Sequence, residues 1–229
     1  MRHAIYFAPR PGTEFHALGS RWIGRDAFTG EVLGQPDVPG IAVASAEPRR
    51  YGFHATLKPP FALRESMTCE ALLRAVAALA GREGDVSIRL RVAVLDGFLA
   101  LVPTEPSDAL QRLAESVVHD LDGFRRPASE AELARRRSAP LSPRQEQHLA
   151  DWGYPYVLED FRFHMTLTER QPAADVERLA AAAEAHFAPV LVAPVAVDGL
   201  TLFAEPSPGA AFLATRHFPF SSSAAEVAA

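Results

Sequence analysis

Cysteine, long apolar runs and excess positive charge are all scarce in this sequence. Cys69 is the only cysteine, which excludes an internal disulfide and a thiolate metal cluster. Apolar runs fall short of the roughly 20 residues that span a bilayer, and the N-terminal run is too short for a signal peptide. The net charge of −5 argues against general nucleic-acid binding, which requires a basic surface. We therefore expect a cytoplasmic protein without a membrane partner.

Several common catalytic motifs are also absent. The sequence has no Gly-x-Ser-x-Gly elbow, no Gly-rich phosphate-binding loop and no dinucleotide fingerprint. No His-Glu-x-x-His pair is present, and zinc would need a third protein ligand. We therefore expect neither a metal nor a cofactor.

The overall composition is that of an ordinary globular chain. Of its 229 residues, 48% are hydrophobic and 22% are charged. This length supports a sizeable core, in one large domain or in two closely packed lobes. We expect one bilobal domain over residues 1–220 and a disordered tail over residues 221–229.

The sequence does contain a repeated pentapeptide. Phe53-His54-Ala55-Thr56-Leu57 and Phe163-His164-Met165-Thr166-Leu167 share the pattern Phe-His-x-Thr-Leu, and their histidines are 110 residues apart. Strand side chains alternate with a period of two, so strands over 53–58 and 161–168 would each place His and Thr on one face. The apolar neighbours would then pack on the other face.

Each motif opens a similar order of elements. After the first motif strand, which should stop at Pro59-Pro60, we expect a helix capped by Thr68 and a strand turning at Asp96-Gly97. After the second motif we expect a helix, a strand and a turn at Asp198-Gly199. The other expected segments are a strand over 3–8, a helix over 14–26, loops over 29–50, a strand over 86–95, a helix from Ser107, a helix over 175–187, and strands over 190–197 and 211–218. The repeated order predicts two matching halves.

Residues 124–151 lie between these halves and differ in character. Ser129 with Glu132, and Ser142 with Gln145, have the capping-box pattern of two helix starts. We therefore predict a helical hairpin inserted over about 124–151. Its run Arg135-Arg136-Arg137 stands near Glu130 and Glu132, which favours a solvated face over a nucleic-acid patch.

Two histidines and two threonines in one groove would suit a phosphodiester or cyclic phosphate. Because the unperturbed pKa of histidine is ~6.5, one imidazole can act as base and the other as acid near neutral pH. The threonine hydroxyls can donate hydrogen bonds to phosphoryl oxygens as charge develops. The predicted catalytic residues are therefore His54, Thr56, His164 and Thr166.

Strand parity suggests further contacts to the substrate. Lys58 shares the predicted face of His54, and Arg162 shares that of His164, so either can hold an anionic group. The alternative for both is a charged side chain that points to solvent. Four tyrosines are candidate stacking or hydrogen-bonding walls, with packing in the core or at the rim as the alternative; they are Tyr6, Tyr51, Tyr154 and Tyr156.

The paired motifs resemble a known superfamily. One His-x-Thr-Leu per half is similar to the two-histidine (2H) phosphoesterases, which include RNA 2′,3′-cyclic phosphodiesterases and RNA 2′-5′ ligase-like proteins. The context Tyr51–Phe61, with Trp22–Asp26 upstream and Phe161–Leu167 downstream, resembles the bacterial DUF1045 branch, described as a phosphonate metabolism protein. The likeness covers nearly the whole chain except the tail.

This resemblance implies both a fold and an activity. The fold would be α+β and bilobal with a pseudo-twofold axis, its two antiparallel β-sheets facing a central groove and its helices outside. The activity would be metal-independent opening of a cyclic phosphate on a small sugar or nucleotide, such as a phosphoribosyl cyclic phosphate, by a phosphoric diester hydrolase. The hairpin expected over 124–151 departs from the minimal pattern of the superfamily, and a lid is one role that it could have. The alternatives are an RNA-end cyclic phosphodiesterase or 2′-5′ ligase, which would bind RNA, and a phosphate-binding module without catalysis.

Overall fold

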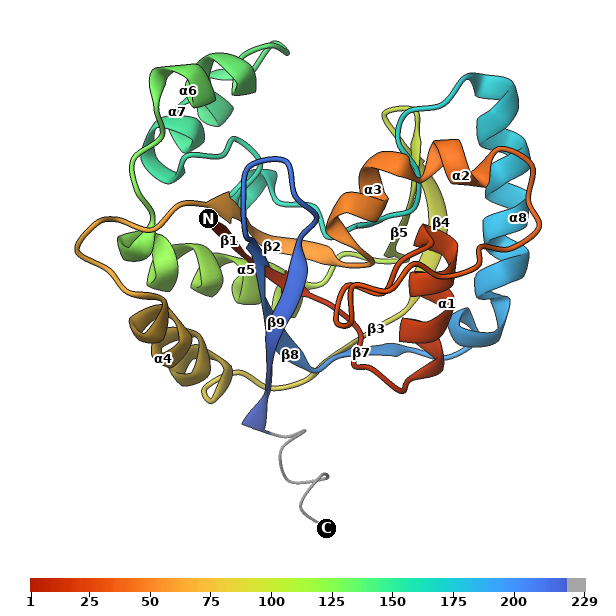
Figure 1. The fold of residues 1–229 in the computed structure, drawn as a ribbon, viewed down its shortest axis with the longest axis horizontal. Coiled ribbons are helices and arrows are strands. Elements are labelled where there is room, and N and C mark those ends of the chain that lie inside the picture. Colours follow the sequence, from red (N-terminus) through yellow and green to blue (C-terminus); the bar gives the residue numbers. More distant parts are fainter. Residues whose placement is uncertain (222–229) are drawn as a thin grey trace.

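The computed structural model of this chain describes residues 1–221 (Figure 1). The predicted tail therefore lies outside the described residues, apart from Ser221. The helices are α1 (Glu14–Ile23), α2 (Ile41–Ala44), α3 (Ala46–Tyr51), α4 (Cys69–Ala80), α5 (Asp108–Leu121), α6 (Glu130–Arg136), α7 (Pro143–Trp152) and α8 (Ala173–Leu191), with short 3-10 turns at Asp122–Phe124 and Leu158–Asp160. The strands are β1 (Arg2–Phe7), β2 (Ala55–Phe61), β3 (Val86–Ile88), β4 (Leu90–Leu95), β5 (Phe98–Pro103), β6 (Met165–Thr166), β7 (Val195–Val197), β8 (Gly199–Glu205) and β9 (Leu213–Pro219).

The strands form one large sheet and one small one. The large sheet has seven strands in the order β4-β5-β6-β2-β1-β8-β9, and β3 pairs with β7 in the small sheet. Neighbouring strands are antiparallel throughout the described residues. The α+β class is therefore confirmed. The expected pair of facing sheets is wrong, because β2 and β6 hydrogen-bond to each other and join both halves into one continuous sheet.

Helices cover one face of this sheet and bury its main core. Helix α5 packs against β2, α4 against β8 and β9, and α8 against β4 and β5 (Figure 1). Alternate side chains of β1 point to opposite faces of the sheet. Ile5 and Phe7 pack in the large core under the helices, whereas Tyr6 belongs to a smaller apolar cluster on the opposite face. That opposite face is the one left for a binding site.

The order of elements repeats as the sequence predicts. In each half a motif strand is followed by a long helix, a short strand of the small sheet and a hairpin of the large sheet: α4-β3-β4-β5 and α8-β7-β8-β9. The Asp96-Gly97 turn is confirmed, with φ of 47° and 86° at these residues. Asp198-Gly199 is not a hairpin turn, because β7 and β8 belong to different sheets. The strand expected over 86–95 divides in the same way into β3 and β4.

Other predicted boundaries also need correction. The sequence predicts loops over 29–50, but α2 and most of α3 lie there, and the strand expected from residue 190 begins at Val195 because α8 continues to Leu191. The first motif strand starts one residue after His54 and runs through Pro59-Pro60 to Phe61. Prolines are tolerated at these positions because β6 pairs with β2 only at Ala55. Within residues 1–221, no strand therefore pairs with this edge of β2 at Pro59 and Pro60. The second motif strand contains just Met165 and Thr166.

The helical hairpin over 124–151 is confirmed. Both capping boxes are formed, by Ser129 with Glu132 at α6 and by Ser142 with Gln145 at α7. In Figure 1 the pair stands out from the sheet on the same side as α3. Across residues 1–221, no helix has the length and apolar character needed to cross a membrane.

Candidate active site

The two His-x-Thr motifs lie side by side because their strands pair. Ala55 of β2 is opposite Met165 of β6 in an antiparallel register. The same register places His54 opposite Thr166, and Thr56 opposite His164. Since Ala55 and Met165 are buried in the core, their sequence neighbours point to the other face of the sheet. The four predicted catalytic side chains are therefore brought together on one face.

Each imidazole is oriented by its own backbone. The Nδ1 of His54 lies 2.9 Å from the carbonyl oxygen of Gly52, and the Nδ1 of His164 lies 2.8 Å from that of Arg162. A carbonyl only accepts, so Nδ1 carries the proton in both rings and Nε2 of the neutral ring is an acceptor. The Nε2 of His54 is 3.3 Å from the Thr56 hydroxyl. Both imidazoles are thus oriented in the same way by a backbone carbonyl two residues earlier, and in the first motif Nε2 lies beside a threonine hydroxyl.

His54 is held neutral by its surroundings. Burial lowers its pKa to about 4, the bond to the Gly52 carbonyl partly opposes this, and the charge of nearby His164 lowers it further. The Tyr6 ring stacks on it, with ring centroids 3.9 Å apart and planes 25° from parallel. Burial also raises the pKa of the Tyr6 hydroxyl well above 10, so this group remains a neutral donor. At pH 7 His54 is therefore neutral, and its Nε2 carries no proton.

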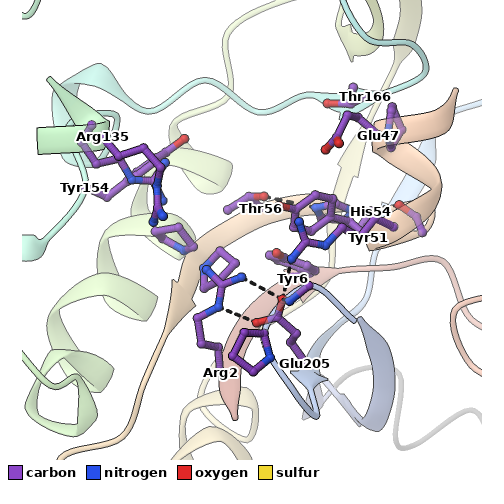
Figure 2. A pocket seen from close by; sticks show the side chains of 18 of the residues that line it. Arg2, Tyr6, Glu47, Tyr51, His54, Thr56, Arg135, Tyr154, Thr166 and Glu205 are labelled. Carbon is purple, nitrogen blue, oxygen red and sulfur yellow. Dashed lines mark hydrogen bonds and ion pairs between the residues drawn. The ribbon is translucent and has the colours of Figure 1, made fainter. Parts of the chain in front are cut away.

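A cavity of about 1060 Å³ opens over this face. Its lining includes His54, Thr56, Thr166, Tyr6 and Tyr51, together with six arginines and four glutamates. Figure 2 shows His54, Thr56 and Tyr51 in its centre, with Thr166 and Glu47 on one side and Arg135 and Tyr154 on another. His164 packs against Phe98, which itself lines the cavity, with ring centroids 5.9 Å apart. The cavity is large enough for a small phosphorylated molecule.

The lower wall of the cavity is built around a buried carboxylate. Glu205, 1% exposed, lies 2.6 Å from Arg2 Nε and 2.5 Å from Arg50 Nη2 and accepts a bond from the Gly209 amide (Figure 2). The bond from Arg2 and then that from Arg50 hold the pKa of Glu205 down to about 2, against the effect of burial. This network fixes two arginines at the cavity, and nothing in the local sequence pattern predicts it.

Lys58 does not contact the cavity, so its predicted orientation is wrong. Tyr6 of β1 pairs with Thr56 of β2, but the preceding residue Ile5 pairs with Lys58, two residues further along β2. This extra residue in β2 is a β-bulge. The bulge reverses the alternation and turns Lys58 to the helical face. There the Lys58 ammonium lies 3.1 Å from an Asp122 carboxylate oxygen.

The remaining predicted contacts divide into those at the cavity and those away from it. Arg162 is exposed and acts through its backbone carbonyl, because it precedes β6 and is not part of a strand. Tyr6, Tyr51 and Tyr154 line the cavity as predicted walls, whereas Tyr156 is 45% exposed. The arginine run is solvated as predicted, because Arg135 and Arg137 are exposed, and in addition Arg135 and Arg136 line the cavity.

Comparisons with known proteins identify relatives of the chain. A family model described as "Protein of unknown function (DUF1045)" matches residues 56–213. Ribose 1,5-bisphosphate phosphokinase PhnN of Janthinobacterium sp. (strain Marseille) is 42% identical over 230 residues, covering 96% of this chain and 51% of the relative. The protein of the same name from Laribacter hongkongensis (strain HLHK9) is 39% identical over 214 residues, covering 93% and 50%. This chain spans about half the length of these curated relatives.

A solved structure also matches the chain. The crystal structure of TT0787 of Thermus thermophilus is 19% identical, with a TM-score of 0.48, over 96% of this chain and 98% of that chain. A likeness at this level supports no argument about fold or function.

The names of the curated relatives overturn the predicted activity. A phosphokinase is a transferase, so these names contradict the phosphoric diester hydrolase that opens a cyclic phosphate. Among residues 1–221, no group of three or more His, Cys, Asp or Glu side chains is placed to hold a metal ion. The resemblance to the DUF1045 branch is confirmed. Because the family model matches well over half of its length, the chain belongs to the DUF1045 family.

Proposed function

We propose that this chain binds a phosphorylated ribose in the cavity beside His54 and presents it for phosphoryl transfer. The pairing of β2 with β6 carries this proposal, because it gathers two threonine hydroxyls and the His54 imidazole at one cavity and places His164 on the same face of the sheet, against the cavity-lining Phe98. The curated relatives, which this chain matches over about half of their length, also support it, because their names specify ribose 1,5-bisphosphate and a phosphokinase. We also infer a two-histidine phosphoesterase type of fold from the pseudo-symmetric motifs, and a place in phosphonate metabolism.

In this proposal the threonines hold a phosphate group. The hydroxyls of Thr56 and Thr166 line the cavity and can each donate a hydrogen bond to a phosphate oxygen. Arg2 and Arg50, fixed by Glu205, add positive charge at the lower wall of the same cavity. Charge-assisted bonds of this kind are about twice as strong as neutral ones.

The His54 imidazole handles the proton. The neutral Nε2 of His54 can accept the proton of a ribose hydroxyl, or of a monoprotonated phosphate oxygen, as that oxygen bonds to the phosphorus of a phosphoryl donor. The bond from that phosphorus to the donor's leaving oxygen breaks in the same step, and the electron pair stays on the leaving oxygen. The proton then resides on Nε2 of His54, while Nδ1 keeps its bond to the Gly52 carbonyl. We assign the phosphoryl donor to the part of the relatives that this chain does not cover, because no Gly-rich phosphate loop stands in its sequence.

Calorimetric titration with ribose 1,5-bisphosphate and with unphosphorylated ribose tests this function. We expect the bisphosphate to bind and ribose not to bind, with affinity falling roughly tenfold or more in Thr56→Val and Thr166→Val, because each loses a bond to a charged group. Thr104→Val, at an exposed threonine away from the cavity, should bind like wild type. Equal binding of ribose and its bisphosphate, or equal losses in all three variants, would refute the proposal.

A further inference from the structure

The last turn of α6 brings two arginines over the cavity from the side opposite Thr166. Arg135 and Arg136 line the cavity together with Tyr154, and Figure 2 shows Arg135 and Tyr154 across the central group from Thr166. We propose that Arg135 and Arg136 form a second anion subsite, which binds a phosphate other than the one beside His54. This inference rests on the proposed function and specifies its ligand as a ribose that carries two separated phosphates.

Arg136 is held in a fixed position for such a role. Its guanidinium carbon lies 4.7 Å from the centroid of the Tyr154 ring. Burial raises the pKa of the Tyr154 hydroxyl, which the charge of Arg136 opposes. Among residues 1–221, no hydrogen bond or ion pair occupies the N–H groups of the Arg136 guanidinium, so they stay available for phosphate oxygens. The entropic cost of ordering this side chain is therefore met before a ligand binds.

Arg135 is the complementary member of the pair. Within residues 1–221, no hydrogen bond or ion pair joins its guanidinium to a protein group. Its neighbours differ: Arg137 is 2.9 Å from Glu146, and Arg126 is 3.2 Å from Glu132. An arginine that lines a cavity with its donors unused suits a bidentate contact with an anion.

The charge of Arg136 also acts on a residue that contacts His54. The charge of Arg136 lowers the pKa of Tyr6, although burial dominates and raises it, and the Tyr6 ring is the one that stacks on His54. The base of the hairpin is tied down as well, because Arg125 bonds both the Asp122 carboxylate and the Asp151 carbonyl. The arginines therefore stand at a defined place relative to His54.

The charge pattern favours a small ligand over a polymer. Four glutamates also line the cavity and interrupt its positive surface; they are Glu47, Glu132, Glu169 and Glu205. A nucleic-acid strand would need a continuous basic track along its backbone. Two separate clusters of donors, one at the threonines and one at α6, match two separate phosphates.

Binding of ribose 5-phosphate and ribose 1,5-bisphosphate to the full chain, measured by calorimetry, tests this subsite. We expect Arg135→Ala and Arg136→Ala to weaken the bisphosphate roughly tenfold to hundredfold and to reduce its preference over the monophosphate. Arg137→Ala is the matched control on the same helix end and should leave both affinities unchanged. An equal loss for both ligands, no loss, or the same loss in Arg137→Ala would overturn the subsite.

A second readout separates this inference from the proposed function. Arginine Nε–Hε signals are followed by NMR while inorganic phosphate is added to wild type and to Thr56→Val. Shifts at Arg135 and Arg136 that persist in Thr56→Val support the subsite even where neither ribose phosphate binds. If these signals do not move, or move no more than that of Arg137, the subsite is refuted whether or not ribose phosphates bind at the threonines.

Discussion

At the residue scale, the surroundings of His54 keep its imidazole neutral. Tyr6 stacks on its ring, and the Gly52 carbonyl holds its Nδ1. Burial, the largest cause, lowers its pKa to about 4 from 6.5. The folded protein therefore resists protonation at a pH where the unfolded chain accepts the proton.

The first prediction concerns stability against pH. Because the folded pKa of His54 lies below the unfolded one, its contribution is fully present above pH 6.5 and is lost as the pH falls towards 4. The loss should amount to on the order of 3 kcal/mol in the free energy of unfolding. Urea denaturation between pH 7 and pH 4 measures it, and His54→Asn should show a correspondingly shallower decline. Parallel pH curves for the two proteins would show that His54 does not titrate in this way.

Glu205 carries the second residue-scale prediction. Its carboxylate joins Arg2 and Arg50, so Glu205→Gln removes a charge that both guanidinium groups share. We expect the free energy of unfolding to fall by about 2–3 kcal/mol, and ribose phosphate binding to weaken as the arginines lose their fixed positions. Chemical denaturation and calorimetry measure the two effects. Glu184→Gln, at an exposed position on α8, is the control, and a similar small change in both variants would contradict the role of Glu205.

At the scale of elements, the bulge in β2 decides what Lys58 does. It turns the ammonium away from the cavity and towards Asp122, which also binds Arg125 at the base of the α6–α7 hairpin. Burial lowers the pKa of Lys58, and Asp122 opposes that shift, so the pair is a structural link.

The third prediction follows from this link. Lys58→Met keeps the aliphatic stem but removes the ion pair, and Asp122 retains Arg125 as a partner. We expect a loss of about 1–3 kcal/mol in the free energy of unfolding and less than about a threefold change in ribose phosphate affinity. Denaturation and calorimetry on the same variant check both values. Strong loss of binding without loss of stability would return Lys58 to the role of an anion contact.

The same bulge marks the limit of prediction from sequence. Period-two alternation correctly places His54 with Thr56, because these residues precede the bulge, and it fails at Lys58, which follows it. Capping boxes predict the α6–α7 hairpin because their signals are local. That Arg135 and Arg136 reach the cavity depends on how the hairpin packs, and no short-range pattern encodes that packing.

At the scale of the whole molecule, the repeat is real but its geometry differs from the expected one. The resemblance implies two sheets that face each other across a groove, yet β2 and β6 pair edge to edge in one sheet. The two Asp-Gly pairs are similar in sequence but do not occupy equivalent positions in the two halves. Asp96-Gly97 closes the β4–β5 hairpin, whereas Asp198-Gly199 connects β7 of the small sheet with β8 of the large sheet. The convergence of the motifs is predictable from their symmetry, and the edge that joins them is not.

If both motifs act as a single site for a phosphorylated ribose, one ligand should affect both imidazoles. NMR of the two imidazoles during titration with ribose 1,5-bisphosphate tests this. We expect the Nε2 signals of His54 and His164 to shift together with one dissociation constant, and His119, which is exposed on α5, not to respond. Movement of only one of the two imidazoles, different constants for them, or no shift at saturating ligand would contradict a single shared site.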